Sequence, residues 1–301
     1  MIRWLIADDL TGAADASVHF ASRREVTLSF DRLEADGLVA IDSETRSLPP
    51  AAAARVVSEL ARGMTGGVFK KVDSTLRGPV AAELEALRVA LGRRAVLLAP
   101  SLPAQGRIVA AGRLLVAGQD RGSVRELAGI DAVDASTDEE LDQVAAACAA
   151  DPTLLPAGSA GLAAAFARLE GPARTAPRPP RVESVLVVVG SPHPVAREQA
   201  RVLGAHLPRG VLLRESTRAG KRALGALSPG TAIVATGGDT ARAICAELDL
   251  RSLRVRGELL PGVVWMEAEG RILVSKSGGF GAPDHLLLAT RKLIGSQDQA
   301  K

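Results

Sequence analysis

The chain has 301 residues, of which 47% are hydrophobic and 24% charged, and its net charge is +3. These values are typical of a soluble globular protein, and the length leaves room for two domains. Only 2% of the residues are aromatic and none is tyrosine, which argues against single-stranded nucleic-acid binding, because such proteins stack bases on aromatic rings. The basic residues are interspersed with acids, so the weak positive charge fits a small anionic substrate, and we expect no nucleic-acid partner.

Cys148 and Cys245 are the only cysteines, too few for a disulfide framework and without the spacing of a zinc site. We expect both to be small buried side chains. No stretch approaches the ~20 apolar residues of a membrane helix. Asp8 and Asp9 interrupt the first apolar run, so the N-terminus lacks the layout of a signal peptide. We therefore expect a cytoplasmic protein with no membrane partner.

Short apolar stretches alternate along the chain with Ala-rich amphipathic stretches. The predicted strands are residues 2–7, 26–30, 38–42, 67–71, 95–100, 185–190, 210–214, 231–236, 263–267 and 272–276. The predicted helices are residues 12–22, 50–62, 79–91, 138–149, 159–169, 195–206, 217–226, 239–248 and 284–294. Continuous apolar strands separated by helices are typical of parallel sheets covered on both faces, so the predicted fold class is α/β. Residues 101–136 lack a clear period and yield no predicted element.

Residues 170–183, EGPARTAPRPPRVE, are rich in proline and charge and have no apolar period. Such a composition predicts an interdomain linker. We therefore predict an N-terminal domain over 1–169 and a C-terminal domain over 184–301. Both are expected to be α/β domains with mainly parallel sheets, and a ligand cleft is expected between them.

Two acidic residues and a hydroxyl follow the first predicted strand, in the segment ADDLTG. Ligands of parallel sheets collect beyond the carboxyl ends of the strands. Asp8, Asp9 and Thr11 lie at such an end, just before a helix. One of them is enough to cap that helix, whereas two carboxylates and a hydroxyl also suit a polar substrate or a metal.

A second polar cluster follows the predicted strand 67–71, in KKVDSTLRG. Its members are Lys70, Lys71, Asp73, Ser74, Thr75 and Arg77. Cations and hydroxyls beside a carboxylate suit a hydroxy acid, because Lys or Arg binds the carboxylate and Asp accepts from a hydroxyl. The alternative is a capped turn with solvated charges. Gln105 and Arg107 follow the next strand and are candidates for the same crevice, while GSAGLA (158–163) is more typical of close packing.

Three predicted strands of the C-terminal half end in glycine-containing turns that open helices. Their candidate ligand residues are Ser191, Gly237, Gly238, Asp239, Thr240, Lys276, Gly278, Gly279 and Gly281. Glycines let the backbone approach a ligand closely, and a helix N-terminus offers N–H groups to phosphate. The alternative for Asp239 or Thr240 is a plain helix cap. No GxxxxGK[ST] motif and no GxGxxG after a strand occur, which argues against a P-loop protein and a dinucleotide dehydrogenase. The four histidines have no metal-ligand spacing.

Seven segments occur in order: ADDLTGAAD (7–15), KKVDSTLRG (70–78), GSAGLA (158–163), VVGS (188–191), TGGDTA (236–241), ELLPGV (258–263) and KSGGFG (276–281). Together they resemble the four-carbon acid sugar kinases, the family of 3-oxo-tetronate, D-threonate and D-erythronate kinases. The resemblance covers nearly the whole chain. It implies transfer of the ATP γ-phosphate, with Mg²⁺, to a hydroxyl of a four-carbon sugar acid. It also implies that the N-terminal domain holds the sugar acid and the C-terminal domain the nucleotide.

Matched by motif, the resemblance implies that Asp8, Asp9, Lys71, Asp73, Ser74 and Arg77 line the acceptor site. It implies that Ser191, Gly237, Gly238, Asp239, Thr240, Gly278, Gly279 and Gly281 surround the nucleotide. We expect in-line transfer, in which positioning and charge neutralisation do most of the work. Arg77 and a lysine would bind the substrate carboxylate, and Lys276 would add positive charge at the phosphates. Asp8, Asp9 or Asp73 would orient or deprotonate the hydroxyl; the choice stays open, with Asp9 preferred.

The chain departs from the family pattern in two places. It is shorter than usual, with the loss expected after GRIVAAGRLLV (106–116), and His193 stands where the family commonly has a hydroxyl residue. Two other functions therefore stay open: a non-catalytic protein that binds nucleotide and sugar acid, and a kinase for a different sugar or sugar acid. The sequence leaves the oligomeric state open, with a homodimer as one option.

Overall fold

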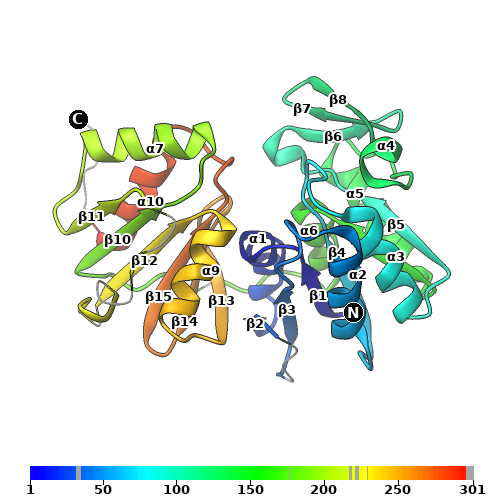
Figure 1. Cartoon of the computed structure of the whole chain (residues 1–301), viewed down its shortest axis with the longest axis horizontal. Helices are drawn as coiled ribbons and strands as arrows, with labels where there is room; N and C mark the ends of the chain where they lie inside the picture. The colour runs from blue at the N-terminus through cyan, green and yellow to red at the C-terminus, as the bar shows by residue number, and fades with distance from the viewer. Residues whose placement is uncertain (32–34, 176, 217–218, 221–223, 229, 296–301) are drawn as a thin grey trace. The chain divides into compact units, whose positions relative to one another are not determined.

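The computed structural model describes residues 1–31, 35–175, 177–216, 219–220, 224–228 and 230–295. The chain divides into two compact units, Met1–Arg174 and Thr175–Lys301 (Figure 1). The division falls within the segment 170–183 that the sequence predicts as a linker. Each end of this segment is bonded to its own unit, since Arg174 N–H donates to Ser22 and Val182 N–H donates to Leu293.

Unit 1 is built on a parallel sheet of six strands. Their order is β2 (Val26–Ser29), β3 (Leu38–Asp42), β1 (Ile2–Ala7), β4 (Gly67–Lys71), β9 (Leu154–Gly158) and β5 (Ala95–Ala99). The last residues of β1, β3 and β4 are register partners, as are the last residues of β4, β9 and β5. The loops that follow these strands therefore leave from one carboxyl edge.

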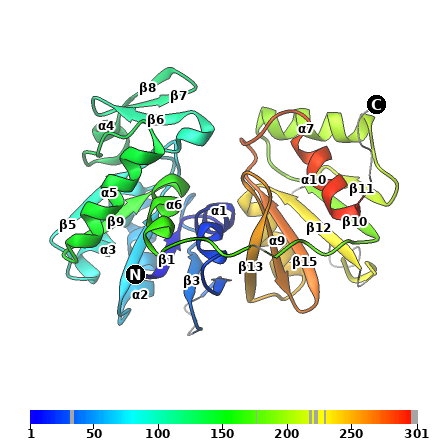
Figure 2. The ribbon, with the colours of Figure 1, turned by 180° about the vertical axis from the view of Figure 1, so that it is seen from behind.

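Helices cover both faces of this sheet, as the apolar strands predict. Figure 1 shows α2 (Pro50–Ala61) and α3 (Val80–Ala90) on one face, and Figure 2 shows α1 (Leu10–Ala21), α5 (Asp138–Ala150) and α6 (Ala160–Leu169) on the other. The core under α2 and α3 contains Trp4, Ile6 and Leu87, all at most 2% exposed. Because side chains alternate between faces, successive residues at a strand end point toward different helices.

The region without predicted elements forms a small antiparallel sheet. Its strands are β6 (Arg107–Ala110), β7 (Arg113–Val116) and β8 (Gln119–Ser123), preceded by the 3₁₀ turn η1 (Pro103–Gln105) and followed by α4 (Val124–Ala128). These strands have four or five residues each, and β8 is mostly exposed. Strands of four or five residues are too short to show a clear apolar period, which explains why the sequence does not predict them.

Two other strands escape prediction. Pro156 lies in the middle of β9, and proline argues against a central strand because it cannot donate to the ladder. The strand nevertheless pairs along its length with β5, while its described pairs with β4 are limited to Ala157 and Gly158. The strand β13 (Ser252–Leu260) alternates buried and exposed residues and contains irregular register around Gly257.

Unit 2 carries a mixed sheet in the order β11 (Val211–Arg214), β10 (Ser184–Val189), β12 (Thr231–Thr236), β15 (Arg271–Lys276), β14 (Val263–Ala268) and β13. The first four strands are parallel, and β14 is antiparallel to both neighbours. The helices α7 (Pro194–Ala205) and α10 (His285–Ile294) pack on one face over Val187, Val274 and Trp265. The helix α9 (Gly238–Glu247) covers the other face (Figure 1). Half of the predicted helix 217–226, residues 217–218 and 221–223, lies outside the described residues.

The predicted α/β class with mainly parallel sheets is confirmed for each unit. Within the described residues, no helix has the length and apolar character needed to cross a membrane.

Candidate functional site

The two aspartates after β1 share one guanidinium group. Arg46 Nε and Nη2 donate to the two oxygens of Asp8 at 2.7 and 2.8 Å, and Nη1 and Nη2 donate to the two oxygens of Asp9 at 2.5 and 2.9 Å. Burial alone would raise the pKa of Asp8, but the charge and hydrogen bonds of Arg46 lower it. Burial would lower the pKa of Arg46, but the charges of Asp9 and Asp8 outweigh the effect of burial and raise that pKa. Both aspartates are therefore held as acceptors at this edge.

Asp9 also begins helix α1. Its side chain accepts from Gly12 N–H at 2.7 Å, and Thr11 Oγ1 donates to it at 2.8 Å. This is the cap that the sequence offers as the plain alternative, and Asp9 binds Arg46 as well. A side chain at position 12 would lie 2.6 Å from Asp9 Oδ1 and 3.2 Å from Lys71 Nζ, so only glycine fits beside these two groups.

Asp73 organises the loop after β4. It accepts from Thr75 N–H at 3.0 Å, from the Thr75 hydroxyl, and from Arg77 Nε and Nη2 at 3.0 and 2.7 Å. Burial would raise the pKa of Asp73, but the hydrogen bonds from Arg77 and the charge of Arg46 hold it well below its usual range. With both oxygens engaged, Asp73 is a loop anchor and a weak proton acceptor. The Arg77 side chain is 60% exposed and stays accessible to a ligand.

The two lysines at the end of β4 point to different faces. Lys70 is fully buried toward α3, and its ammonium donates to Glu83 at 2.9 Å. Lys71 is 4% exposed on the α1 side, and its ammonium donates to the Val72 carbonyl at 2.8 Å. Among the described residues, no carboxylate lies within 4.0 Å of Lys71 Nζ. Lys71 is therefore the lysine that geometry favours for a substrate carboxylate, and Lys70 serves an internal ion pair.

Arg46 and Glu83 are site residues that the sequence reasoning missed. Arg46 ends the loop DSETR after β3, which leaves from the same edge as the two predicted clusters. Thr45 Oγ1 donates to Glu83 at 2.5 Å and shares a 2.7 Å hydrogen bond with Ser43 Oγ, so Glu83 holds this loop in place. Inspecting the end of every predicted strand would have found Arg46, but only the tertiary structure reveals Glu83.

The remaining candidates of unit 1 lie on the same edge or above it. Ser74 is 6% exposed in the Asp73 loop. Gln105 ends η1, and Arg107 opens β6, where burial lowers its pKa and the charges of Asp73 and Asp15 oppose that effect. The cations Arg46, Lys71, Arg77 and Arg107 thus lie with the carboxylates of Asp8, Asp9 and Asp73 at or next to one edge of the sheet.

In unit 2, the three predicted glycine turns meet at the carboxyl edge of β10, β12 and β15. The last residues of these strands are register partners. A Cβ added at Gly237 would lie 3.3 Å from Ser191 Cβ, and one at Gly278 would lie 1.9 Å from Ser191 Oγ. Gly237 also has a φ of +93°, which glycine adopts without strain. These turns therefore need glycine in order to lie against Ser191.

The helix α9 begins in this corner without a side-chain cap. Gly237 is its N-cap residue, Asp239 is exposed and Thr240 is 1% exposed. The first-turn N–H groups of such a helix attract anions. His193 caps α7 through Nδ1, which accepts from Val195 N–H at 3.2 Å, and a Cβ at Gly279 would lie 3.2 Å from its Nε2. His193 thus lies beside the turn that contains Gly278, Gly279 and Gly281.

Lys276 closes β15 at the same edge. It is 0% exposed, its ammonium donates to the Ser277 carbonyl at 2.8 Å, and burial lowers its pKa to about 7. Gln199 of α7 donates to the carbonyls of Phe280 and Ala282 at 3.0 and 2.8 Å, which ties the last glycine turn to the helix.

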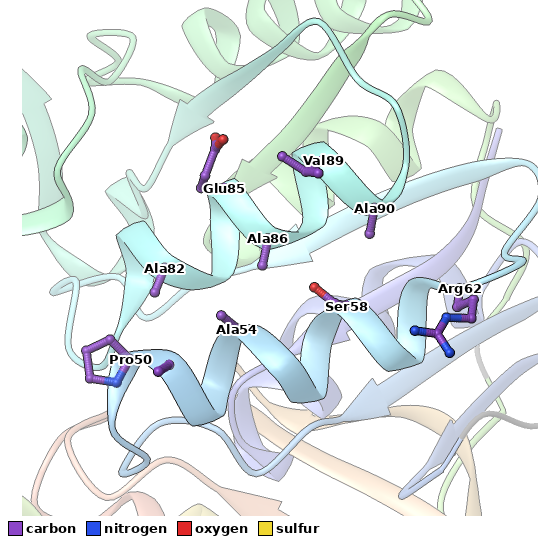
Figure 3. Close-up of a pocket in the computed structure, with 10 residues that line it drawn as sticks. Pro50, Ala54, Ser58, Arg62, Ala82, Glu85, Ala86, Val89 and Ala90 are labelled. Carbon is purple, nitrogen blue, oxygen red and sulfur yellow. The ribbon is translucent and has the colours of Figure 1, made fainter.

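Within the described residues, no three acidic, histidine or cysteine side chains form a group that could hold a metal ion. The carboxylates of unit 1 bind guanidinium groups instead, so we assign no metal ligands. A groove of about 610 Å³ runs between α2 and α3, lined by small side chains such as Ala54, Ser58 and Ala86 (Figure 3). It lies between helices, and none of the candidate residues lines it.

Comparisons with known proteins match one family description within each unit. Residues 4–127 match the family described as a sugar-binding N-terminal domain, and residues 213–286 match the nucleotide-binding C-terminal domain. The D-threonate kinase of Cupriavidus necator is 30% identical over 398 aligned positions, which cover 93% of this chain and 95% of the kinase. The alignment is longer than the chain, which confirms that the chain is short for its relatives.

Two solved structures extend the likeness. A Salmonella typhimurium protein described as a putative tRNA synthase has a TM-score of 0.75 at 20% identity, with 96% of this chain and 99% of that one covered; this likeness concerns the fold alone. A Bordetella bronchiseptica domain of unknown function, a domain-swapped dimer with bound citrate, has a TM-score of 0.50 at 28% identity and coverage of 97% and 98%. The chain belongs to the family of two-domain acid sugar kinases that includes the D-threonate kinases.

Proposed function

We propose that this protein is a kinase that transfers a phosphoryl group from ATP to a hydroxyl of a four-carbon acid sugar, a tetronate or 3-oxo-tetronate. The observation that carries the proposal is the cluster at the carboxyl edge of unit 1, where Lys71 and Arg77 accompany the acceptors Asp8 and Asp9. Cations for a carboxylate beside acceptors for hydroxyls are what a hydroxy acid requires. The names of the relatives support the same substrate class.

In this proposal, Lys71 and Arg77 bind the substrate carboxylate, and Thr11, Ser74, Thr75, Gln105 and Arg107 complete the acceptor site. Asp9 orients the attacking hydroxyl and receives its proton. Asp8 binds the guanidinium group of Arg46 together with Asp9, and Asp73 anchors the loop after β4. Arg46 donates to both oxygens of Asp9, so Asp9 can accept the proton only after the substrate displaces part of this hydrogen bonding.

The nucleotide is proposed to bind at the carboxyl edge of unit 2. Gly237, Gly238, Gly278, Gly279 and Gly281 allow close approach of the phosphates, with Ser191, Asp239 and Thr240 beside them and Lys276 as the cation. A divalent metal, Mg²⁺, is proposed to arrive with ATP and to neutralise phosphate charge. The predicted ligand cleft between the domains, the cytoplasmic location and a homodimer stay predictions. X-ray scattering with and without ligands, cell fractionation and light scattering test them in turn.

The test is ADP release from MgATP against a panel of tetronates, 3-oxo-tetronates and longer aldonates. Turnover on one four-carbon acid, lost in Lys71→Met, is the expected result. Turnover only on longer or uncharged sugars would refute the substrate class. Nucleotide binding without any turnover across the panel would refute the kinase and leave the binding protein as the better explanation.

A further inference from the structure

We propose that Lys276 neutralises the terminal phosphate of the nucleotide and that nucleotide binding delivers a proton from solvent to its amine. This inference rests on the proposed nucleotide site of unit 2 and specifies how that site acquires its positive charge. It concerns a coupling between binding and protonation, so it can fail while the kinase assignment stands.

Lys276 is a buried amine without a counter-ion. Its side chain is 0% exposed, and the hydrogen bond it makes is to the Ser277 carbonyl at 2.8 Å. Among the described residues, no carboxylate lies within 4.0 Å of its Nζ. Buried charges in proteins are normally paired, because removing an unpaired charge from water is costly. A site with such a lysine therefore favours either a neutral amine or an anionic ligand.

A second polar group beside Lys276 also lacks a partner. Thr236 is the register partner of Lys276 on β12, so the two side chains lie on the same face of the sheet. Thr236 is 0% exposed, and within the described chain its hydroxyl makes no hydrogen bond. Buried hydroxyls nearly always have a partner. The amine of Lys276 and the hydroxyl of Thr236 can therefore both donate hydrogen bonds to a phosphate oxygen.

The backbone around this pair is arranged for the same ligand. Gly237 follows Thr236 and is the N-cap of α9, and no side chain caps the first N–H groups of that helix. Gly237 N–H is bound to the Lys276 carbonyl at 2.8 Å, which fixes the two strand ends together. Gly278 lies against Ser191. The start of α9, the lysine and the threonine thus lie at the same end of two neighbouring strands, with both side chains on the face that α7 and α10 cover.

The protonation state of Lys276 follows from its surroundings. The neighbouring segments carry these titratable or charged groups: His193 before α7, Asp239, Arg242 and Glu247 in α9, Glu258 beside the turn to β14, and Asp284 and His285 at the start of α10. Burial is the cause that lowers the pKa of Lys276 to about 7, and no nearby charge opposes it. Above neutral pH the free protein therefore holds mostly neutral amine. A bound phosphate favours the ammonium, so the amine nitrogen takes a proton from the buffer as the nucleotide binds.

Titration calorimetry of the full chain with Mg²⁺ and the non-hydrolysable analogue AMP-PNP tests this proposal. At pH 8 the binding enthalpy, measured in buffers of different ionisation enthalpy, should reveal uptake of nearly one proton per nucleotide, falling toward zero at pH 6. The Kd of the unaltered protein should rise about tenfold per pH unit above pH 8, as expected for one linked proton. Adenosine, which has no phosphate, should bind without proton uptake.

Two variants separate the lysine from other sources of protons. Lys276→Arg keeps a cation that stays protonated, so it should bind AMP-PNP with no uptake, and Lys276→Met should bind at least tenfold more weakly. AMP-PNP binding without uptake at pH 8, or unchanged uptake in Lys276→Arg, would overturn the inference and leave the kinase proposal intact. Absence of AMP-PNP binding by the unaltered protein at pH 6 and pH 8 would overturn both.

Discussion

Replacing Glu83 by alanine should destabilise unit 1 strongly. From the sequence alone, Glu83 would pass for an ordinary exposed residue of a helix, and the structure shows that it is buried. In the folded protein its carboxylate is the partner of Lys70, with side-chain exposures of 2% and 0%. It also accepts the Thr45 hydroxyl at 2.5 Å. The substitution therefore leaves one buried ammonium and one buried hydroxyl with fewer partners.

The expected cost follows from the burial of the pair. Removing one partner of a buried ion pair costs about 3–5 kcal/mol, whereas an exposed pair contributes ~0–1 kcal/mol. We therefore expect Glu83→Ala to lower the free energy of unfolding of unit 1 by about 4 kcal/mol.

The chain offers a clean fluorescence assay for this unit. Its two tryptophans are divided between the units, Trp4 in unit 1 and Trp265 in unit 2. In a Trp265→Phe background, urea unfolding followed by fluorescence reports unit 1 through Trp4. The matched control is Glu85→Ala on the same helix, which removes the partner of Arg88 in an exposed pair at 2.7 Å and should leave the midpoint unchanged.

A double variant distinguishes pairing from packing. Lys70→Met/Glu83→Met removes both charges and keeps the volume, so it should recover most of the stability lost in Glu83→Ala, because apolar replacement of a buried pair is often neutral. The reasoning is refuted if Glu83→Ala unfolds at the same urea concentration as Glu85→Ala, or if the double variant is as unstable as the single one.

Further measurements address the site and its support. Asp9→Asn should lower kcat for ADP release by about 10²–10⁴, the usual contribution of a general base, and full turnover in both Asp9→Asn and Asp73→Asn would exclude acid–base catalysis by these groups. Gln199→Leu removes the donor to the turn at 280–282 and should raise the KM for ATP roughly tenfold, since about 1–3 kcal/mol of hydrogen bonding is lost; an equal rise in the KM for the sugar acid would indicate general unfolding instead. Burial lowers the pKa of Lys276 from its ordinary value of 10.5 to about 7 in the folded protein, so Lys276 should make the free energy of unfolding rise as pH increases through this window, by about 1.4 kcal/mol per pH unit. Lys276→Met should abolish that slope in urea titrations at pH 7 to 10, and a slope that persists would mean that another group titrates.

The sequence predicts the strand ends of both units well, because parallel strands are apolar over their whole length and stop at polar turns. Asp8, Asp9 and Lys71 come together as expected, since β1 and β4 are neighbours. What the sequence does not contain is the direction of each side chain relative to the helices. Lys70 and Lys71 are adjacent and chemically alike, yet one lies under α3 and the other beside α1.

The missed residues have the same physical origin. Arg46 reaches Asp8 because β1 and β3 are neighbours in register, so that Arg46 Nε lies 2.7 Å from Asp8 Oδ2 although the two residues are 38 positions apart. Glu83 is 1% exposed because α3 packs on the sheet at that position, and its helix has no periodicity that singles it out. Strand β9 was missed because Pro156 argues locally against a strand, while the sheet accepts it between β4 and β5.

The place of β9 has a consequence for how the protein is made. It is the last strand of unit 1 in the chain, yet it lies between β4 and β5, which were synthesised earlier. Until residue 158 leaves the ribosome, β5 has no sheet neighbour and β4 has an open edge, and open edges favour aggregation. A fragment that stops at residue 127, where the match to the sugar-binding domain ends, should therefore not fold. Chaperones should have to protect the nascent chain from aggregation until β9 joins the sheet.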